Sequence, residues 1–345
     1  MTRSVRILTM VGVAAVVVSS GACARSSDDD AATRRTAAQH ASTTHAGSAS
    51  SDIGAGRTPS SMAGPVRPSA DNPCGATSAP PAKYDHVLVI MEENRRWRDV
   101  GGVGFRDPAM PYLHGLAQKC TTFADWTETD TSQNSLTQYI GLTSGVSNPH
   151  TTNDCSPSKK CRSTDDNIFR QVRTSGGSAR SYVEGADAPC SAAGNAARHV
   201  PALYYAGSYT DTGGIHDDQD ACATEVRPLA DLVPSNLPTF AVVTPNLCND
   251  GHDCGNGVVD RWLARFLPSI LNGSSYRGGT TAVMVLYDED HPVPNLLVAP
   301  TARAGVDKTP GAGHTAMLRT WEEMLGLPLL PGVTSAMSLR SPANI

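Results

Sequence analysis

The sequence lacks several features that would assign it to common protein classes. After the first two dozen residues, no apolar run is long enough to cross a bilayer. Lysine and arginine form no basic stripe and the net charge is −5, so a nucleic acid is not expected as a partner. No two cysteines have the C-x-x-C spacing of a zinc knuckle. These absences argue against further membrane spans, nucleic-acid binding and small zinc modules.

Large apolar residues are also scarce between residues 24 and 82. This segment consists mostly of Ser, Ala, Thr, Gly and Pro, with an acidic run at Asp28, Asp29 and Asp30. A chain of this composition cannot bury enough apolar surface to offset the entropy that it would lose on ordering. We therefore predict a flexible linker over residues 24–82 and a folded domain over residues 83–345.

The first 23 residues have the pattern of a leader. Arg3 and Arg6 precede an apolar stretch over residues 7–18, which is too short for a lasting transmembrane helix and typical of a secretory signal. Small residues then lead into Cys23, as in bacterial lipoprotein signals. The pattern predicts an exported protein of the cell envelope. It would be either lipid-anchored through Cys23 to the outer face of the cell membrane or released after plain cleavage.

The sequence contains nine cysteines, an odd number for an exported protein. Setting Cys23 aside leaves an even set, which in an oxidising compartment predicts four disulfides and no free thiol. The eight residues are Cys74, Cys120, Cys155, Cys161, Cys190, Cys222, Cys248 and Cys254. The close pairs Cys155/Cys161 and Cys248/Cys254 could each close one loop, leaving Cys190 with Cys222 and Cys74 with Cys120. Spacing alone leaves this connectivity open.

Three apolar runs have the composition of strands buried on both faces of a parallel sheet. They cover residues 86–91, 239–244 and 280–287, and none contains Gly or Pro. Shorter strands are expected at 120–126, 179–183 and 296–298, and helices at 110–119, 134–145, 168–174, 258–271 and 315–325. Strand, polar loop and helix alternate throughout. The fold class that this alternation predicts is α/β, with a mostly parallel central sheet and helices on both faces.

Polar side chains follow the buried strands at the point where each strand ends. Glu93 and Asn94 follow the first run, and Asp288 and Glu289 follow the third. Open α/β sheets hold their ligands at the carboxyl ends of the strands, so these groups should meet there. A similar set comprises Asp250, His252 and Asp253 after the middle run and His314 before the last helix. Oxygen-rich ligation of this kind predicts a divalent metal ion, although turns and satisfied core histidines would explain any one residue.

Ser135 falls at the start of the helix expected over residues 134–145. A serine at this position is often only an N-cap. The same position aims the hydroxyl at the positive end of the helix dipole, where a phosphate oxygen would be stabilised. Beside a metal ion, such a serine could lose its proton and attack phosphorus.

Six segments resemble, in order, motifs of the bacterial phosphoesterase family. They are EEN, NSLTQYIGLTSG, ARHVP, TPNLCNDGHD, VLYDED and GHTAMLRTWEEMLGLP, and the resemblance covers residues 83–331. That family contains secreted acid phosphatases and phospholipases C and belongs to the alkaline phosphatase superfamily. The resemblance implies an alkaline-phosphatase-like fold, and a phosphoesterase catalytic domain over residues 83–345.

The resemblance also implies roles for individual residues. Ser135 matches the family nucleophile, and His252 and His314 would complete the catalytic set. The metal ligands would be Glu93, Asn94, Ser135, Asp288 and Glu289. The substrate would contact Asn94, Gln138, His199, Asp250 and Asp253, with Gln138 standing where the family has Asn.

The reaction that the sequence predicts is hydrolysis of phosphomonoesters by an exported, metal-dependent acid phosphatase through a phosphoserine intermediate. One alternative is a phospholipase C-type phosphodiesterase, although such family members are longer. Another is a lipoprotein that binds ligands without turning them over. The absence of a C-x-P-x-R sequence argues against a formylglycine sulfatase. The expected partners are a small phosphorylated substrate, with phospholipids and phosphoinositides as candidates, and a membrane reached through the lipid anchor; the expected state is a monomer.

Overall fold

The computed structural model describes residues 66–192, 194–205 and 219–345. The leader, Cys23 and most of the serine-rich segment lie outside these described residues. Export, cleavage and lipidation at Cys23 therefore stay predictions. None of the helices in the described ranges is long and apolar enough to cross a membrane.

An eight-stranded sheet with the order β4-β3-β5-β1-β6-β7-β2-β8 forms the centre of the domain. The strands are β1 (His86–Glu92), β2 (Thr121–Phe123), β3 (Ala179–Val183), β4 (Val226–Pro228), β5 (Phe240–Thr244), β6 (Thr281–Tyr287), β7 (Asn295–Val298) and β8 (Gly305–Asp307). Strand β1 lies between β5 and β6 and is parallel to both. Strand β7 pairs antiparallel with both of its neighbours. The prediction of a mostly parallel α/β sheet is confirmed.

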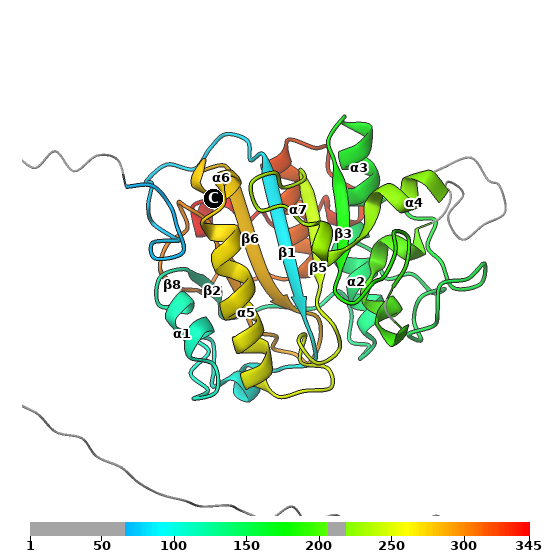
Figure 1. The fold of residues 1–345 in the computed structure, drawn as a ribbon, viewed down its shortest axis with the longest axis horizontal. Helices are drawn as coiled ribbons and strands as arrows, with labels where there is room; N and C mark the ends of the chain where they lie inside the picture. The colour runs from blue at the N-terminus through cyan, green and yellow to red at the C-terminus, as the bar shows by residue number, and fades with distance from the viewer. Residues whose placement is uncertain (1–65, 193, 206–218) are drawn as a thin grey trace, which may run out of the picture. The chain divides into compact units, whose positions relative to one another are not determined.

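Helices cover both faces of this sheet, as Figure 1 shows, with α5 in front and α7 behind. The helices are α1 (Pro111–Ala117), α2 (Ser135–Ser144), α3 (Ile168–Thr174), α4 (Gln219–Glu225), α5 (Asn256–Leu271), α6 (Ser274–Arg277), α7 (His314–Leu325) and α8 (Arg340–Ala343). Short 3-10 helices occupy Trp97–Val100, Gly194–His199, Pro201–Tyr204, Leu229–Asp231 and Pro331–Val333. Helix α1 packs on α5, and α2 packs on α7, so each face carries its own helical layer.

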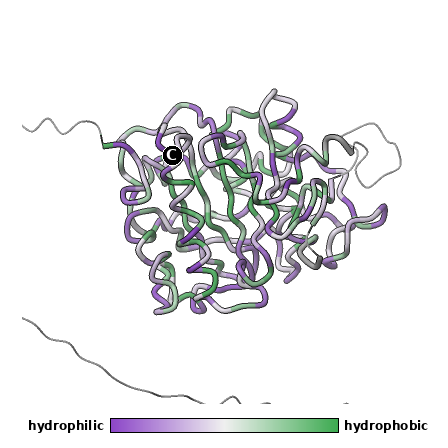
Figure 2. The backbone as a smooth tube through the Cα atoms, viewed as in Figure 1, coloured by the Kyte–Doolittle hydropathy of each residue, from purple (hydrophilic) through white to green (hydrophobic). Residues whose placement is uncertain are grey.

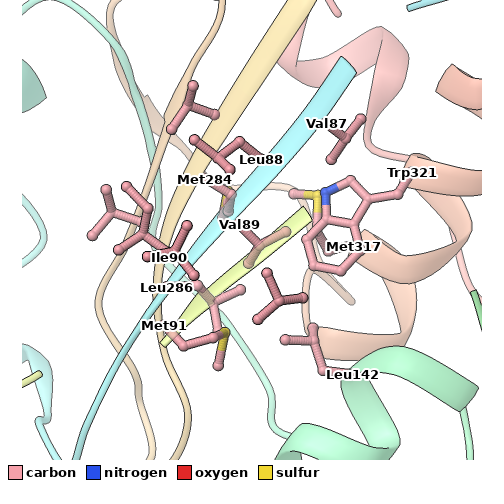
Figure 3. Packing of buried hydrophobic residues seen from close by; sticks show 14 of the residues in the cluster. Val87, Leu88, Val89, Ile90, Met91, Leu142, Met284, Leu286, Met317 and Trp321 are labelled. Carbon is pink, nitrogen blue, oxygen red and sulfur yellow. The ribbon is translucent and has the colours of Figure 1, made fainter. Parts of the chain in front are cut away.

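The core explains why β1 is apolar on both sides. Side chains alternate along the strand, and Figure 3 shows Val87 and Val89 on the side of Trp321, with Leu88 and Ile90 on the opposite side. All five residues from Val87 to Met91 are buried. The sheet strands form the most hydrophobic part of the described chain in Figure 2. The same alternation places Glu93, two positions beyond Met91, on the side of the sheet that α2 and α7 cover.

The two short edge strands, β4 and β8, are not predicted by the sequence pattern. Each has only three residues. A run of three residues is too short to show a period of two, and each of these strands forms by pairing with the backbone of one neighbouring strand. Strand β4 adds to β3, and β8 adds to β2.

Residues 66–82 pack against the domain, although their composition predicts a linker. Cys74 is bonded to Cys120, and the Thr77 N–H donates to the Pro300 carbonyl at 3.1 Å. The Tyr276 hydroxyl donates to the Pro73 carbonyl. These contacts join residues far apart in the sequence, so composition does not reveal them. Residues 66–82 of the predicted linker therefore contact the folded domain.

Four disulfides join the eight cysteines that follow Cys23. They are Cys74–Cys120, Cys155–Cys161, Cys190–Cys222 and Cys248–Cys254. This connectivity is one that the sequence left open. A set of four bridges is typical of an exported protein, because the cytosol keeps thiols reduced.

The pairing of all eight cysteines predicts the outcome of a thiol titration. Protein lacking Cys23, denatured without reductant, should show essentially no reaction with a thiol reagent, because the eight remaining cysteines are all bridged. The same sample should show eight thiols after reduction. One or two thiols per chain before reduction would contradict the pairing.

Candidate active site

Glu93 lies at the centre of the candidate site. It follows β1 directly, is fully buried, and points to the side of α2. Its Oε2 accepts a hydrogen bond from the Ser135 hydroxyl at 3.0 Å, and its Oε1 accepts one from the Tyr139 hydroxyl at 2.5 Å. Ser135 and Tyr139 are four residues apart on α2 and so share one helical face. The Glu93 carboxylate therefore binds α2 through two hydroxyl groups of that helix.

Asn94 connects the end of β1 to the end of β6. Its φ of 55° is in the left-handed region, which Asn tolerates better than most residues. Its backbone N–H donates to Asp288 Oδ1 at 3.1 Å, and its side-chain Nδ2 lies 3.4 Å from Glu93 Oε2. Burial raises the pKa of Asp288, whereas the Asn94 N–H, Glu93 and Ser135 lower it, so these residues are close enough to interact. The fold thus brings together the two strand ends that the sequence marked.

His199 and Asp250 complete a three-residue cluster with Glu93. His199 Nε2 lies 3.4 Å from Glu93 Oε1, and Nδ1 lies 3.4 Å from Asp250 Oδ2. One ligand atom from each of the three residues lies within 4.8 Å of the others, and all three side chains are buried. The Tyr139 ring stacks on the His199 ring at 5.4 Å. These three residues could hold a metal ion.

The carboxyl groups in this cluster are held close together away from water. Burial raises the pKa of Glu93 well above its usual value, and the Asp288 and Asp250 charges raise it further. Burial likewise raises the pKa of Asp250 to about 7. The pKa of Glu289 rises to about 9, from burial first and then from Asp288. Without a neutralising charge, these groups would not all be ionised at neutral pH.

Several buried polar atoms at the site have no hydrogen-bond partner. They are Asp250 Oδ2, Asp288 Oδ2, Glu289 Oε2 and both ring nitrogens of His199. Burial lowers the pKa of His199 to about 3, so its ring is neutral and has a lone pair to give. A divalent cation would bind both the carboxylate oxygens that lack a hydrogen-bond partner and the neutral imidazole beside them. The residues at this edge of the sheet therefore fit a metal ion.

His252 and Asp253 lie at the outer side of the cluster. His252 Nε2 lies 3.1 Å from an Arg198 guanidinium nitrogen, and Nδ1 lies 2.6 Å from Asp253 Oδ1. Arginine can only donate, so Nε2 accepts and Nδ1 carries the proton that goes to Asp253. The His252 ring lies 5.7 Å from the His199 ring.

His314 begins α7 and is fully buried. Its Nδ1 lies 3.5 Å from the Thr129 hydroxyl, and its Nε2 has no partner. Burial lowers the pKa of His314 to about 4. Across the described part of the chain, no hydrogen bond or ion pair joins His314 to Glu93 or Ser135. Its catalytic role stays a prediction.

Gln138 lies one turn from Ser135, but it is engaged with the loop before α2. Its Oε1 accepts from the Thr129 N–H at 2.9 Å, and its Nε2 donates to the Ser132 carbonyl at 2.9 Å. Both ends of the amide are therefore used to hold this loop. The predicted contact between Gln138 and substrate would require a further bond from the same amide.

The loop that Gln138 holds lines a hollow with a volume of about 570 Å³. Its lining residues are Arg96, Thr127, Glu128, Thr129, Asp130, Thr131, Ser132, Gln133 and His291. Arg96 pairs with Asp290 at 3.1 Å. The lining combines hydroxyl and amide groups with two acidic and two basic side chains, and the loop leads into the helix that begins at Ser135.

A serine hydroxyl and a cluster of carboxylate and imidazole groups at the carboxyl edge of a parallel sheet are typical of hydrolases that act with a bound cation. Residues 102–293 match the model of the Phosphoesterase family, and this range exceeds half of the chain. The chain belongs to the Phosphoesterase family. The matched range contains Ser135, His199 and Asp288 and ends before His314.

Curated relatives are phosphatases. The chain is 27% identical over 272 residues to a phosphatidylinositol-3-phosphatase of Mycobacterium tuberculosis, covering 76% of this chain and 83% of that protein. A stretch of 60 residues is 35% identical to an acid phosphatase of Aspergillus fumigatus, covering 17% of this chain and 13% of that protein. Together with the family, these matches make the protein a phosphoester hydrolase.

Solved structures show a weaker likeness. A protein of the alkaline phosphatase superfamily from Vibrio parahaemolyticus aligns with a TM-score of 0.48 and 12% identity, over 80% of this chain and 72% of that one. The lipoteichoic acid synthase LtaP from Listeria monocytogenes aligns with a TM-score of 0.45 and 10% identity, over 74% of each chain. The family assignment rests on the sequence matches.

Two residues of the site were not predicted as functional from the sequence. Tyr139 bonds to Glu93, and its spacing of four from Ser135 is a signal that could have placed it on the same face. Arg198 contacts His252, and only its position beside His199 in the sequence marks it.

Proposed function

We propose that the protein is an exported, metal-dependent phosphatase that hydrolyses phosphomonoesters through a phosphoseryl intermediate on Ser135. The observation that carries the proposal is the hydrogen bond of 3.0 Å from the Ser135 hydroxyl to Glu93 Oε2, at the first residue of α2. A serine so placed has a partner that can take its proton. It also has the positive end of a helix dipole beside it.

The chemistry has two in-line steps. In the first, Ser135 Oγ bonds to phosphorus, its proton passes to Glu93, and the bond from phosphorus to the leaving oxygen breaks. In the second, the oxygen of a water molecule bonds to phosphorus, the bond from phosphorus to Ser135 Oγ breaks, and Oγ takes back the proton from Glu93 as inorganic phosphate is released.

Glu93, His199 and Asp250 would hold the cation, joined by Asp288, Glu289 and Asn94. A bound divalent cation supplies positive charge that stabilises negative charge on the phosphoryl oxygens. The strands β1, β5 and β6 each end at the site and so position the residues that would hold the cation. The Asn94 N–H holds the Asp288 carboxylate in place. Phosphoryl oxygens can also approach the first turn of α2.

Two histidines would move protons. His314 is uncharged at neutral pH because burial lowers its pKa to about 4, and its free Nε2 can accept a proton from the attacking water. His252 is partly exposed and can pass a proton between the leaving oxygen and solvent through its Asp253 partner.

The hollow that precedes α2 would receive the leaving alcohol. Its lining of threonine, serine and glutamine side chains favours a polyhydroxylated leaving group, which can exchange hydrogen bonds with them. A phosphoinositide headgroup has this character, and the mycobacterial relative is named for such a substrate. Lipidation at Cys23 would keep the enzyme at the membrane that carries the lipid.

The proposal is tested by trapping the intermediate. Acid quenching during turnover of a phosphomonoester should leave phosphate on the peptide that contains Ser135, detected by mass spectrometry. A matched phosphodiester should be cleaved at least about tenfold more slowly, a barrier difference of about 1.4 kcal/mol.

Two outcomes would contradict the proposal. Faster cleavage of the diester would indicate a phospholipase C-type enzyme. Stoichiometric binding of phosphate esters with no turnover of either would indicate a ligand-binding lipoprotein.

A further inference from the structure

A basic hollow lies on the loop closed by the Cys155–Cys161 disulfide. Its volume is about 400 Å³, and its lining residues are His150, Lys159, Lys160, Arg162 and Thr164. Four of the five side chains are basic, in a protein whose net charge is −5. Holding like charges close together costs free energy, and a bound anion would remove this cost.

The two lysines occupy the tip of a tight hairpin. Ser158 and Cys161 exchange both backbone hydrogen bonds, at 3.2 and 3.0 Å, so Lys159 and Lys160 are the two turn residues between them. The disulfide from Cys161 to Cys155 fastens the base of the hairpin. The lysine backbone is therefore ordered before any ligand arrives, which lowers the entropic cost of binding.

Arg162 is held by a separate contact. The N–H of the next residue, Ser163, donates to the Tyr204 carbonyl at 2.7 Å and pairs this segment with the chain after η3 (Pro201–Tyr204). Arg162 is half-buried, whereas the two lysines are exposed. Arg162 therefore lies at the base of the hollow, and the two lysines lie at its solvent-exposed edge.

The acidic side chains of this segment are engaged elsewhere. Asp154 Oδ1 accepts the Leu136 N–H at 2.9 Å, and Asp165 Oδ2 accepts from Ser163 Oγ at 2.8 Å. Asp166 pairs with Arg170 at 3.6 Å. Within the described ranges, no carboxylate forms an ion pair with Lys159, Lys160 or Arg162. Their charge is available to an external anion.

The same loop is fastened to the helix that carries Ser135. Asp154 binds the Leu136 N–H, and the Thr137 hydroxyl donates to the Thr151 carbonyl at 3.2 Å. Both contacts are in the first turn of α2. An anion in the hollow would therefore be held on the same rigid frame as the candidate nucleophile.

We propose that this basic hollow binds the phosphate headgroups of an anionic phospholipid surface. Two exposed lysines at a rigid tip can enter the headgroup layer, and Arg162 behind them can bind a phosphate with paired N–H groups. This contact does not require an acyl chain on Cys23 and does not involve any residue of the candidate active site.

The test measures vesicle binding of the chain from residue 24 to residue 345, which retains every described residue and has no acyl chain. Phosphatidylcholine vesicles with and without phosphatidylglycerol are sedimented with the protein, because phosphatidylglycerol is a diester that a monoesterase leaves intact. The protein should bind only the anionic vesicles, and rising salt should weaken the binding. The double variant Lys159→Ala/Lys160→Ala should bind about thirtyfold more weakly, about a factor of five for each lysine.

Matched variants separate charge from structure. Lys83→Ala/Lys308→Ala removes the same charge from two exposed lysines outside the hollow and should bind like the unmodified protein. Lys159→Arg/Lys160→Arg keeps the charge and should also bind normally. Turnover of a soluble aryl phosphate should be unchanged in all three variants.

The proposal is overturned if the unmodified protein ignores anionic vesicles, or if the two alanine double variants lose binding equally. A different result would refute the proposed phosphatase function. A protein that hydrolyses no phosphoester, yet binds anionic vesicles through Lys159 and Lys160, would refute the phosphatase and leave the docking surface intact.

Discussion

Replacement of Ser135 with Ala should lower the turnover of phosphomonoesters at least about a thousandfold, which corresponds to about 4 kcal/mol of barrier. The reason is that the hydroxyl at the start of α2 is the proposed attacking group. The fold should persist, because the mutation removes one hydrogen bond to Glu93, worth about 1 kcal/mol net. Steady-state kinetics and a thermal melt measure both effects.

A serine at the other end of the same helix provides the control. Ser144 is also buried, and its hydroxyl donates to the Ile140 carbonyl at 2.7 Å. Ser144→Ala should lose a comparable amount of stability while keeping turnover within about a factor of two. If Ser135→Ala kept more than about a tenth of the activity, a barrier change of only about 1.4 kcal/mol, Ser135 would not be the nucleophile.

Removal of the proposed metal ion should have the next largest effect. A chelator should lower activity at least about a hundredfold, because loss of one transition-state charge partner costs about 10²–10³ in turnover. It should also lower the thermal midpoint. An ion present at about a hundred times its Kd adds about 2.7 kcal/mol to the native state, which alone can bind it. Burial and crowding of Glu93, Asp250 and Asp288 are the structural reason.

Asp288→Ala should reproduce the chelator effect on activity and make the melt insensitive to chelator. Asp260→Ala is the matched control, because Asp260 is a buried aspartate on α5 whose carboxylate accepts the N–H groups of Tyr112 and Leu113. That variant should lose stability and keep its response to chelator. Full phosphomonoesterase activity in metal-free protein would refute the metal site and the mechanism that uses it.

Several parts of the site can be predicted because they depend on local sequence. Val87–Met91 is an apolar run that only a doubly buried strand explains, so the position of Glu93 at a strand end follows from the residues alone. Ser135 precedes a helical face that includes Tyr139, and Gly145 ends the helix in the left-handed conformation expected of a C-cap. Each of these signals is contained within about ten residues.

Other parts depend on which strands become neighbours. Glu93 meets Asp250 because β1 pairs with β5, and it meets Asp288 because β1 also pairs with β6. His199 comes from the 3-10 helix Gly194–His199, and its carbonyl accepts a hydrogen bond from the Thr244 hydroxyl at the end of β5. Strand order arises from long-range packing, and the pattern of one strand contains no information about its neighbour. The sequence therefore predicted Asp250 and His199 as substrate contacts, whereas the fold groups them with Glu93 as possible metal ligands.

The amino-acid sequence by itself determined the α/β class, the positions of the long strands and helices, and the polar residues at their ends. Tertiary structure alone decided the strand order, the disulfide pairing and the direction of each polar side chain. Gln138 shows the difference: its helical position is readable from the pattern, yet its amide points into the loop at Thr129 and Ser132. Periodicity is a local property of the chain, whereas the partner of a buried polar group is chosen by every element that packs around it.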